Sequence, residues 1–324
     1  MLQYSYLSYL KENYPQYLEH YYKRKEVQNY VVNEFTSFTE KEYKQQILLK
    51  GSIAQAYLQQ YIKDVIKENK SPLFNKIEIE TVNQCNNSCA FCPVNRNADI
   101  RKHTIMLMPL FERVVRQLAE LNYKGCINLF SNNEPLLDPQ LLERLIMTRK
   151  LLPNAYLFLY TNGLLMTPQK LLELLPYVNY IHINNYNSKP ELLPSHKKLQ
   201  EMLIDCQIPI GQVEIHLRNN SECLSTRAGQ APNRIDTAQL TAPCILPFSQ
   251  MVIRPDGKVS YCCNDAYGVY TMGDISSESL LEIWYGNAFE ESRKHMLQGR
   301  GTTAPCCNCD MLFMPLAFET TIRR

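Results

Sequence analysis

The hydrophobic pattern of the chain changes near residue 73. Before this point, apolar and aromatic residues recur every three or four positions, as in Tyr14, Tyr17 and Tyr21, which predicts helices. After it, short apolar runs alternate with amphipathic segments, which predicts strands separated by helices. Elements of these lengths are typical of strand–helix–strand units that build a parallel sheet. We therefore predict a helical N-terminal extension over residues 1–72 that packs against, or covers, an α/β core.

The expected core contains five strands joined mainly by helices. We expect the strands at residues 76–82, 126–130, 155–160, 178–183 and 212–217. We expect helices at residues 109–121, 138–151 and 195–205, and a further helix that begins at Thr167. Asp138 before Pro139, and Thr167 before Pro168, have the residue types of an N-cap and a first helical position. Because parallel sheets bind ligands at the carboxyl ends of their strands, we expect the functional residues there.

The pattern changes again beyond Pro243. A turn signal at residues 254–257 separates two β-like runs, residues 251–254 and 258–262, which predicts a hairpin. Residues 279–285 and 288–297 have helical patterns. We predict three domains: the extension over residues 1–72, a core over residues 73–235, and a small hairpin-and-helix domain over residues 236–324.

The composition and the first residues of the chain indicate where the protein is located and that its cysteines bind metal. The 324 residues are 45% hydrophobic and 20% charged, with a formal net charge of +2. This charge favours neither nucleic acid nor a membrane surface as a partner. The first six residues lack a basic segment followed by an apolar run, and no apolar run has membrane-spanning length, so we expect a cytoplasmic protein. Twelve cysteines in a reducing compartment indicate metal ligation rather than disulfides.

Three of these cysteines lie within eight residues, at Cys85, Cys89 and Cys92, directly after the first core strand. Thiolates suit iron–sulfur clusters and zinc, and three of them leave one corner of a metal site without a protein ligand. Structural zinc is an alternative, but zinc normally takes four protein ligands and the nearest histidine, His103, lies outside the loop. A disulfide is a further alternative, which the absence of a secretion signal disfavours.

The motif Cys-x3-Cys-x2-Cys, with aromatic Phe91 before the last cysteine, resembles the signature of the radical S-adenosylmethionine (SAM) enzymes. The resemblance implies a partial (β/α) TIM-like barrel over residues 73–235. It also implies a 4Fe–4S cluster on the three cysteines, with SAM on the fourth iron and a cofactor contact at Phe91. Cleavage of SAM in this family yields a 5′-deoxyadenosyl radical.

Two further segments support this resemblance. Residues 130–135 follow the second strand, where the family carries a Gly-Gly-Glu-like motif that holds the SAM amino group. Here Asn132 and Asn133 replace the glycines, and the carboxylate is Glu134. Residues 160–163 end the third strand with a Thr-Asn-Gly turn, as the family does, which implies a cofactor contact at Asn162. A Thr-Asn-Gly turn alone also fits a purely structural role.

A second group of cysteines lies in the C-terminal domain. Four thiolates from a hairpin and a Cys-x2-Cys pair make a closed site that suits either an iron–sulfur cluster or zinc. Residues 244–309 resemble the SPASM/Twitch auxiliary-cluster extension of radical SAM enzymes. The Twitch form implies one auxiliary 4Fe–4S cluster, and we assign its ligands as Cys244, Cys262, Cys306 and Cys309. Cys263 and Cys307 are neighbours that can substitute for these ligands.

Residues between the two cysteine groups resemble a segment of the Twitch-type dehydrogenases that oxidise aminocyclitols. The resemblance covers residues 223–229 and implies that Arg227 contacts the substrate; the alternative is an arginine that holds a loop. Cys223 has no counterpart in those enzymes, and it is either a hydrogen-atom donor or a buried structural thiol. We expect Cys126 and Cys206 in the core. His182 and His216 are expected as ordinary polar lining or core.

The leading hypothesis is an oxidative radical SAM enzyme that acts on a polar small molecule, such as an aminocyclitol or sugar. A four-thiolate auxiliary cluster has no open iron, so its expected role is to accept an electron from the substrate. A flavodoxin or ferredoxin is the expected electron donor. The second hypothesis is a peptide maturase that forms a crosslink or inverts a residue, with Cys223 as hydrogen donor. The third is a zinc-stabilised scaffold without catalysis.

Overall fold

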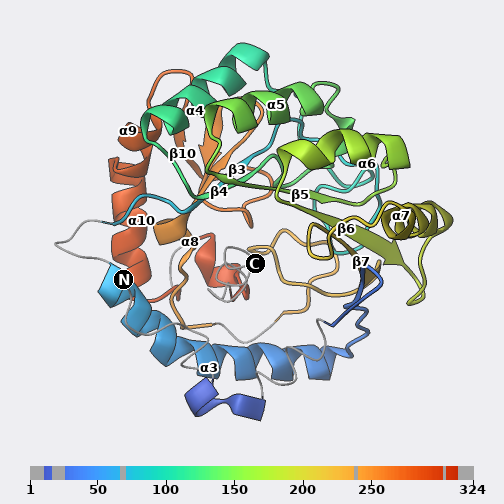
Figure 1. Cartoon of the computed structure of the whole chain (residues 1–324). Helices are drawn as coiled ribbons and strands as arrows, with labels where there is room; N and C mark the ends of the chain where they lie inside the picture. Colours follow the sequence, from blue (N-terminus) through green and yellow to red (C-terminus); the bar gives the residue numbers. More distant parts are fainter. Residues whose placement is uncertain (1–10, 17–25, 66–70, 237–239, 302–303, 313–324) are drawn as a thin grey trace.

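The chain folds around one ten-stranded sheet in this computed structural model (Figure 1). The structure describes residues 11–16, 26–65, 71–236, 240–301 and 304–312. The strand order is β1-β2-β7-β6-β5-β4-β3-β8-β9-β10. The strands are β1 (Val27–Gln28), β2 (Val31–Asn33), β3 (Lys76–Ile79), β4 (Cys126–Asn128), β5 (Tyr156–Thr161), β6 (Tyr180–Asn187), β7 (Val213–Asn219), β8 (Gln250–Ile253), β9 (Lys258–Ser260) and β10 (Thr271–Asp274).

Strands β3 to β7 pair in parallel, as predicted, and form a curved but open sheet, so the predicted partial barrel is confirmed. The helices on its outer face are α4 (Met108–Glu120), α5 (Leu141–Leu151), α6 (Pro168–Leu174) and α7 (Pro194–Asp205). Thr167 caps α6 as predicted, since its side chain accepts a hydrogen bond from the Lys170 N–H. The N-cap prediction at Asp138 is wrong, because α5 begins at Leu141 and its N-cap is Gln140.

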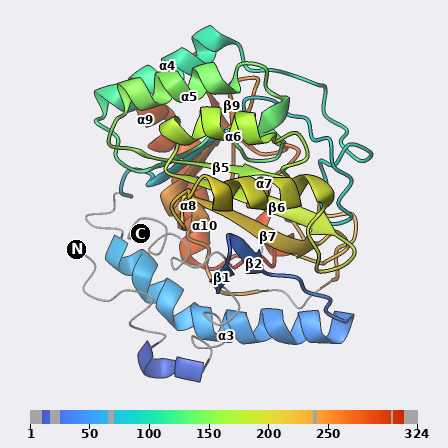
Figure 2. The same cartoon turned by 45° about the vertical axis from the view of Figure 1, so that its right-hand side comes forward.

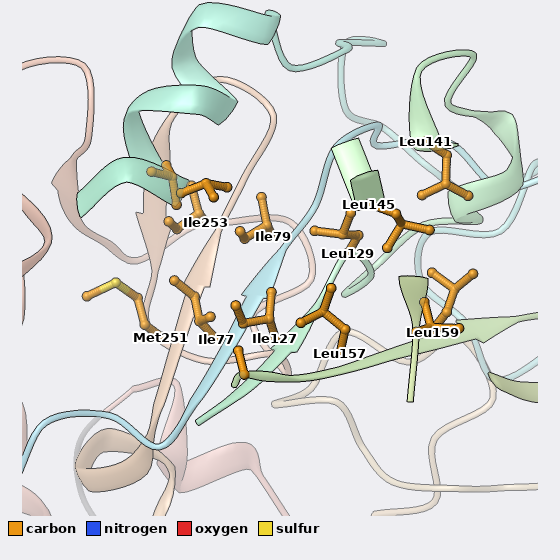
Figure 3. Close-up of a cluster of buried hydrophobic side chains, with 14 of the residues drawn as sticks. Ile77, Ile79, Ile127, Leu129, Leu141, Leu145, Leu157, Leu159, Met251 and Ile253 are labelled. Atoms are coloured by element: carbon orange, nitrogen blue, oxygen red, sulfur yellow. The ribbon is translucent and has the colours of Figure 1, made fainter. Parts of the chain in front are cut away.

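Aliphatic side chains between the sheet and the outer helices form the main core (Figure 3). Ile77, Ile127 and Leu157 come from adjacent strands and point the same way, toward α4 and α5. Side chains alternate between the two faces of a strand, so the residues beside them in sequence face the barrel interior. Those interior residues are largely polar, as Lys76 and Glu78 show. The barrel therefore has an apolar outside and a polar inside.

The N-terminal part contains strands that the helical prediction missed. Helix α3 (Glu40–Val65) agrees with the prediction, and it lies on the side of the molecule opposite α4 and α5 (Figures 1 and 2). Strand β2, however, pairs in parallel with β7 and so extends the barrel sheet. Strands of two and three residues are too short to show a period, which explains the omission. Part of the predicted helix near Tyr17 and Tyr21 lies outside the described residues.

The C-terminal hairpin formed by β8 and β9 is present as predicted, but it joins the same sheet. Strand β8 pairs in parallel with β3, and β9 and β10 follow it in antiparallel order. The short helix α8 (Leu246–Ser249) precedes β8, and α9 (Leu280–Trp284) and α10 (Asn287–Leu297) follow β10. Ser279 and Glu282 form a capping box at the start of α9. No helix among the described residues is apolar over enough turns to cross a bilayer.

Candidate active site

The three-cysteine loop opens onto a cavity of about 200 Å³ at the carboxyl end of the barrel. Cys85, Cys89 and Cys92 all line it. The loop is held by Asn95, whose side-chain amide donates hydrogen bonds to the carbonyls of Cys89 (3.1 Å) and Cys92 (2.8 Å). The sequence did not single out Asn95, because one asparagine in a polar loop has no distinctive spacing.

The thiols of this loop fit a metal cluster better than a protein-only environment. Burial is the main cause that raises the pKa of Cys85 to about 12, and burial also raises the pKa values of Cys89 and Cys92. A buried thiolate therefore needs a cation beside it. Among the described residues no three Cys, His, Asp or Glu side chains are arranged to hold one metal ion.

All five residues predicted to bind the cofactor line the same cavity as the three cysteines. They are Phe91, Asn132, Asn133, Glu134 and Asn162. They come from the ends of different elements, which the parallel pairing of β3, β4 and β5 brings to one edge. The ring of Phe91 packs against Tyr186, on β6, with 5.5 Å between ring centroids. The sequence motifs therefore meet in space as expected for a single site.

Glu134 is a buried carboxylate, 1% exposed, that joins two strand ends. One oxygen, Oε1, accepts hydrogen bonds from the Leu136 N–H (3.0 Å) and the Thr161 hydroxyl (2.6 Å). The other, Oε2, accepts one from the Asn162 N–H (2.7 Å). Burial raises the pKa of Glu134 to about 7, against these three hydrogen bonds, which lower it. The carboxylate therefore fixes the segment after β4 against the turn after β5.

The turn after β5 places Asn162 beside the cysteine loop. Its side-chain amide donates to Asn86 Oδ1 at 2.7 Å and lies 3.8 Å from the Cys85 sulfur. The carbonyl of Asn162 lies 3.0 Å from Nε2 of the buried His196. Gly163 follows with φ +69°, a left-handed conformation that favours glycine. Thus the Thr-Asn-Gly turn also has a specific geometric role.

Arg101 links the cysteine loop to the motif after β4, although no sequence motif pointed to it. Its guanidinium contacts Glu80 (3.0 Å) and Asp99 (2.9 Å), which balance its charge. It also donates to the carbonyls of Asn83 and Asn132, both at 3.0 Å or less. Five fixed donors make arginine suited to this bridging role.

Arg227 lines the cavity, as the resemblance implies. One guanidinium nitrogen, Nη2, donates a short hydrogen bond to Asn132 Oδ1, and buried Nε has no hydrogen-bond partner among the described residues. The backbone of Arg227 and Ala228 is left-handed, with φ of 50° and 54°. Such conformations cost about 1–3 kcal/mol each and concentrate at functional sites.

The loop that carries Arg227 is held by hydrogen bonds that involve residues from both the N-terminal and the C-terminal parts of the chain. Asp310 accepts a hydrogen bond from the Thr226 N–H at 2.7 Å. The hydroxyl of Tyr43, on α3, donates to the other oxygen of Asp310 at 2.6 Å. The N-terminal helix therefore positions the loop that carries Arg227.

Cys223, the predicted hydrogen donor, is not among the residues that line the cavity. It packs instead against a small apolar cluster formed by Tyr43, Ile47 and Leu240. Burial raises the pKa of its thiol, and a hydrogen bond with Tyr43 opposes this. This position suits the structural alternative better than the donor role. Of the other two cysteines, Cys126 is buried as expected, but Cys206 is exposed, so its core prediction is wrong.

A second, smaller cavity is lined by all four cysteines assigned to the auxiliary site, Cys244, Cys262, Cys306 and Cys309. Burial raises the pKa values of Cys262 and Cys309, and it raises that of Cys306 to about 12. Neither Cys263 nor Cys307 lines this cavity. The backbone carbonyl of Cys263 instead accepts a hydrogen bond from the Asn132 side chain at 3.2 Å.

The two cavities share a wall. Met311 lines both of them, while the adjacent residues Arg227 and Ala228 line one each. The sequence did not identify Met311, because it lies beyond the last cysteine and outside every motif. The first cavity therefore borders the cavity that the second group of cysteines lines.

Residues 79–200 match the radical SAM superfamily, and residues 244–310 match the SPASM domain, an iron–sulfur cluster-binding domain. The S-adenosyl-L-methionine-dependent 2-deoxy-scyllo-inosamine dehydrogenase of Niallia circulans is 28% identical over 242 residues, which are 74% of this chain and 93% of that protein.

Solved structures resemble the fold in the same region. The crystal structure of BtrN in complex with AdoMet and 2-DOIA has a TM-score of 0.65 and 26% sequence identity, and the match covers 75% of this chain and 95% of that one. A selenomethionine form of BtrN in an open conformation has a TM-score of 0.57 and 24% identity, with 75% and 94% covered.

Proposed function

We propose that this member of the radical SAM superfamily, which carries a SPASM domain, oxidises a hydroxyl group of an aminocyclitol to a ketone. The substrate class is supported by the 2-deoxy-scyllo-inosamine dehydrogenase, since the similarity extends over 93% of that enzyme. It is also supported by the BtrN complex with 2-DOIA. These relatives favour a small molecule over a peptide.

The radical SAM domain takes a 4Fe–4S cluster and SAM, and the SPASM domain implies auxiliary iron–sulfur binding. When bound, the cluster and SAM supply a radical that removes a hydrogen atom from a C–H bond of the substrate. We assign Cys85, Cys89 and Cys92 to this cluster. The four cysteines of the smaller cavity (Cys244, Cys262, Cys306 and Cys309) are assigned to one auxiliary 4Fe–4S cluster. We also propose that the core domain spans residues 73–235 and the C-terminal domain residues 236–324.

The shared wall at Met311 is the observation that carries the oxidative assignment. Oxidation of an alcohol requires the substrate to lose an electron after the hydrogen atom, and a closed four-thiolate site beside the cavity is suited to accept it. A flavodoxin or ferredoxin is the proposed source of the electron that starts each SAM cleavage.

Arg227 is proposed to orient the substrate. Its guanidinium offers donors to the cavity and no acceptor, so it can hold a hydroxyl oxygen but cannot take the proton from it. Asn132, which already accepts from Arg227, fixes the direction of the guanidinium. Binding the oxygen in this way aligns the carbon beside it for reaction.

The test is an anaerobic assay of the iron-loaded enzyme with SAM, a reductant and 2-deoxy-scyllo-inosamine. The wild type should contain about eight irons and form 5′-deoxyadenosine and ketone in equal amounts. The triple variant Cys85→Ala/Cys89→Ala/Cys92→Ala should lose both products. Cys309→Ala should keep 5′-deoxyadenosine, lose the ketone and hold about half of the iron.

The matched control is Cys206→Ala, which removes an exposed thiol at the end of α7. It should behave as the wild type does. Ketone formation by Cys309→Ala at the wild-type rate would contradict the electron-acceptor role.

A further inference from the structure

Arg300 is a buried arginine, 2% exposed, that lies beside the cysteines of the second cavity. It follows α10 and lines the small cavity together with the four cysteines assigned to the auxiliary site. The function proposed above gives it no role. Burying a charge away from water is costly unless an opposite charge lies near it. A buried arginine at this position therefore needs an explanation.

The donors of Arg300 bind backbone carbonyls of two segments that carry assigned cluster ligands. Nε and Nη2 donate to the carbonyls of residues 242 and 243, at 2.8 and 3.5 Å, just before Cys244. Nη1 donates to the carbonyls of Cys309 (3.2 Å) and Met311 (2.8 Å). Arg300 thus joins the segment of the first assigned ligand to the segment of the last.

These carbonyls satisfy the hydrogen bonds of Arg300 but do not neutralise its charge. Within the described ranges they are its hydrogen-bond partners, and no carboxylate forms an ion pair with it. Asp310, the residue after Cys309, directs its two oxygens to Thr226 and Tyr43 instead. The positive charge is therefore left without an anionic partner in the described part of the chain.

Arg293, on α10, shows how a second buried arginine is stabilised. It is 5% exposed, and its guanidinium lies 4.2 Å from the ring centroid of Trp284 and 5.1 Å from that of Phe289. The faces of aromatic rings attract cations. Arg300 has no such ring contact among the described residues. An anion at the four-cysteine site is the remaining partner for its charge.

Tyr261 supplies a hydrogen-bond donor to the same site. It directly precedes the assigned ligand Cys262, and its hydroxyl oxygen lies 3.6 Å from the sulfur of Cys306. Among the described residues the hydroxyl has no other hydrogen-bond partner. A free thiol can donate to this oxygen, but a metal-bound sulfur has no proton to give. The Tyr261 hydroxyl is then the only possible donor of the pair.

Tyr261, Arg300 and Cys306 line both the small cavity and a larger outer cavity of about 330 Å³. They therefore form the wall between the auxiliary site and the outer cavity. A charge or dipole held inside such a wall acts more strongly than one in solvent, because the protein interior screens it less.

These two side chains match the charge change that the proposed oxidation requires. Four thiolates give a cluster bound there a net negative charge, and the accepted electron adds one more. The potential of an iron–sulfur cluster depends on its net charge, on hydrogen bonds to its sulfurs and on solvent exposure. A fixed cation and a hydroxyl donor stabilise the form with the additional electron more than the form without it.

We propose that Arg300 and Tyr261 raise the reduction potential of the auxiliary cluster and so make it a better electron acceptor for the substrate radical. This inference rests on the proposed function, which assigns a 4Fe–4S cluster to the four cysteines. The step transfers one electron from the substrate radical to the cluster, and no bond of Arg300 or Tyr261 forms or breaks. Neither residue lines the first cavity, so both are positioning residues that act through the cluster.

The experiment is an anaerobic redox titration of the full-length, iron-loaded protein, followed by electron paramagnetic resonance. The background Cys85→Ala/Cys89→Ala/Cys92→Ala leaves the auxiliary cluster alone, so that its potential is measured without overlap. Arg300→Gln should lower the equilibrium constant for reduction at least about tenfold, which corresponds to about 59 mV for a one-electron couple. Arg300→Lys keeps the charge and should recover most of this loss. Tyr261→Phe keeps the ring and should lower the constant about two- to tenfold.

The matched control is Lys294→Gln, which removes a positive charge from an exposed position of α10. It should leave the potential unchanged, because solvent and salt screen that charge. Iron and sulfide analysis of each variant shows whether the cluster is loaded. A loaded Arg300→Gln or Tyr261→Phe variant with the wild-type potential would overturn the role of that residue.

Two other results are also decisive. If Arg300→Gln does not load the cluster, Tyr261→Phe decides: a lower potential supports the inference, and an unchanged one overturns it. A wild-type enzyme that cleaves SAM but makes no ketone from 2-deoxy-scyllo-inosamine would refute the proposed oxidation instead. The potentials of the variants would still test whether Arg300 and Tyr261 stabilise the reduced cluster.

Discussion

Replacing Glu134 by glutamine keeps the size of the side chain but leaves one buried backbone donor without an acceptor. The carboxylate accepts from Leu136 and Thr161 on one oxygen and from Asn162 on the other. An amide has one oxygen and one NH2 group. If its oxygen faces Leu136 and Thr161, the NH2 group faces the Asn162 N–H, and if it is turned over, the NH2 group faces the Leu136 N–H.

The size of the effect follows from these contacts. A hydrogen bond to a charged group contributes about 1.5–3 kcal/mol, and a buried donor left unpaired costs about 1–3 kcal/mol. Because Glu134 is 1% exposed, water cannot replace the lost acceptor. We expect Glu134→Gln to lower the free energy of unfolding by about 2–4 kcal/mol, and the melting temperature by roughly 5 °C or more.

The assay is thermal unfolding of the iron-loaded protein under anaerobic conditions, followed by circular dichroism. The control is Glu143→Gln, the same substitution on the exposed face of α5, which should change stability by less than about 0.5 kcal/mol. Equal melting temperatures for the two variants would refute the claim that Glu134 ties the segment after β4 to the turn after β5.

Three further predictions concern the cluster ligands, the turn after β5 and pH. Cys306→Ala should lose about half of the iron while Cys307→Ala keeps all of it, measured by iron and sulfide analysis, and the reverse result would reassign the ligand. Gly163→Ala should destabilise the protein by about 1 kcal/mol or more and weaken SAM binding in calorimetry, because its φ is +69° and a Cβ would lie 2.6 Å from a histidine nitrogen; unchanged binding would contradict this. The pKa of His216 is raised in the folded state, so its charge stabilises the protein fully below about pH 6.5 and this stability disappears as pH rises through the raised value. Denaturant titrations over this range should show a smaller pH dependence for Glu34→Gln, because Glu34 Oε2 lies 3.2 Å from His216 Nδ1, and equal slopes would argue against this ion pair.

The motifs that follow parallel strands were predictable, and so was their meeting point. The cysteine loop, Glu134 and Asn162 come after β3, β4 and β5, and parallel pairing requires such ends to share an edge. The resemblance to the SPASM/Twitch extension also led to the four cysteines that line the second cavity. Local sequence was sufficient here because the chain direction determines the geometry.

Details that depend on side-chain direction or on distant pairing were not predictable. Cys223 precedes two residues that line the cavity, Leu224 and Ser225, yet its own thiol faces α3. The direction in which a loop residue points depends on its backbone angles. The left-handed turn at Arg227 and Ala228 contains no glycine, so the sequence does not predict it. His182 and His216 were expected to be ordinary polar lining or core, since only the register of β6 with β7 brings their rings together.

The pairing of β8 with β3 has a consequence for any attempt to cut or recombine this chain. A fragment that ends near residue 235 would retain the whole radical SAM match but expose the backbone N–H and C=O groups along one side of β3. A bare strand edge of this kind recruits other strands, so we expect the fragment to aggregate rather than fold as a smaller enzyme. A chimera that exchanges the cluster-binding half must therefore bring a matching β8 with it, and the two halves must be inherited together.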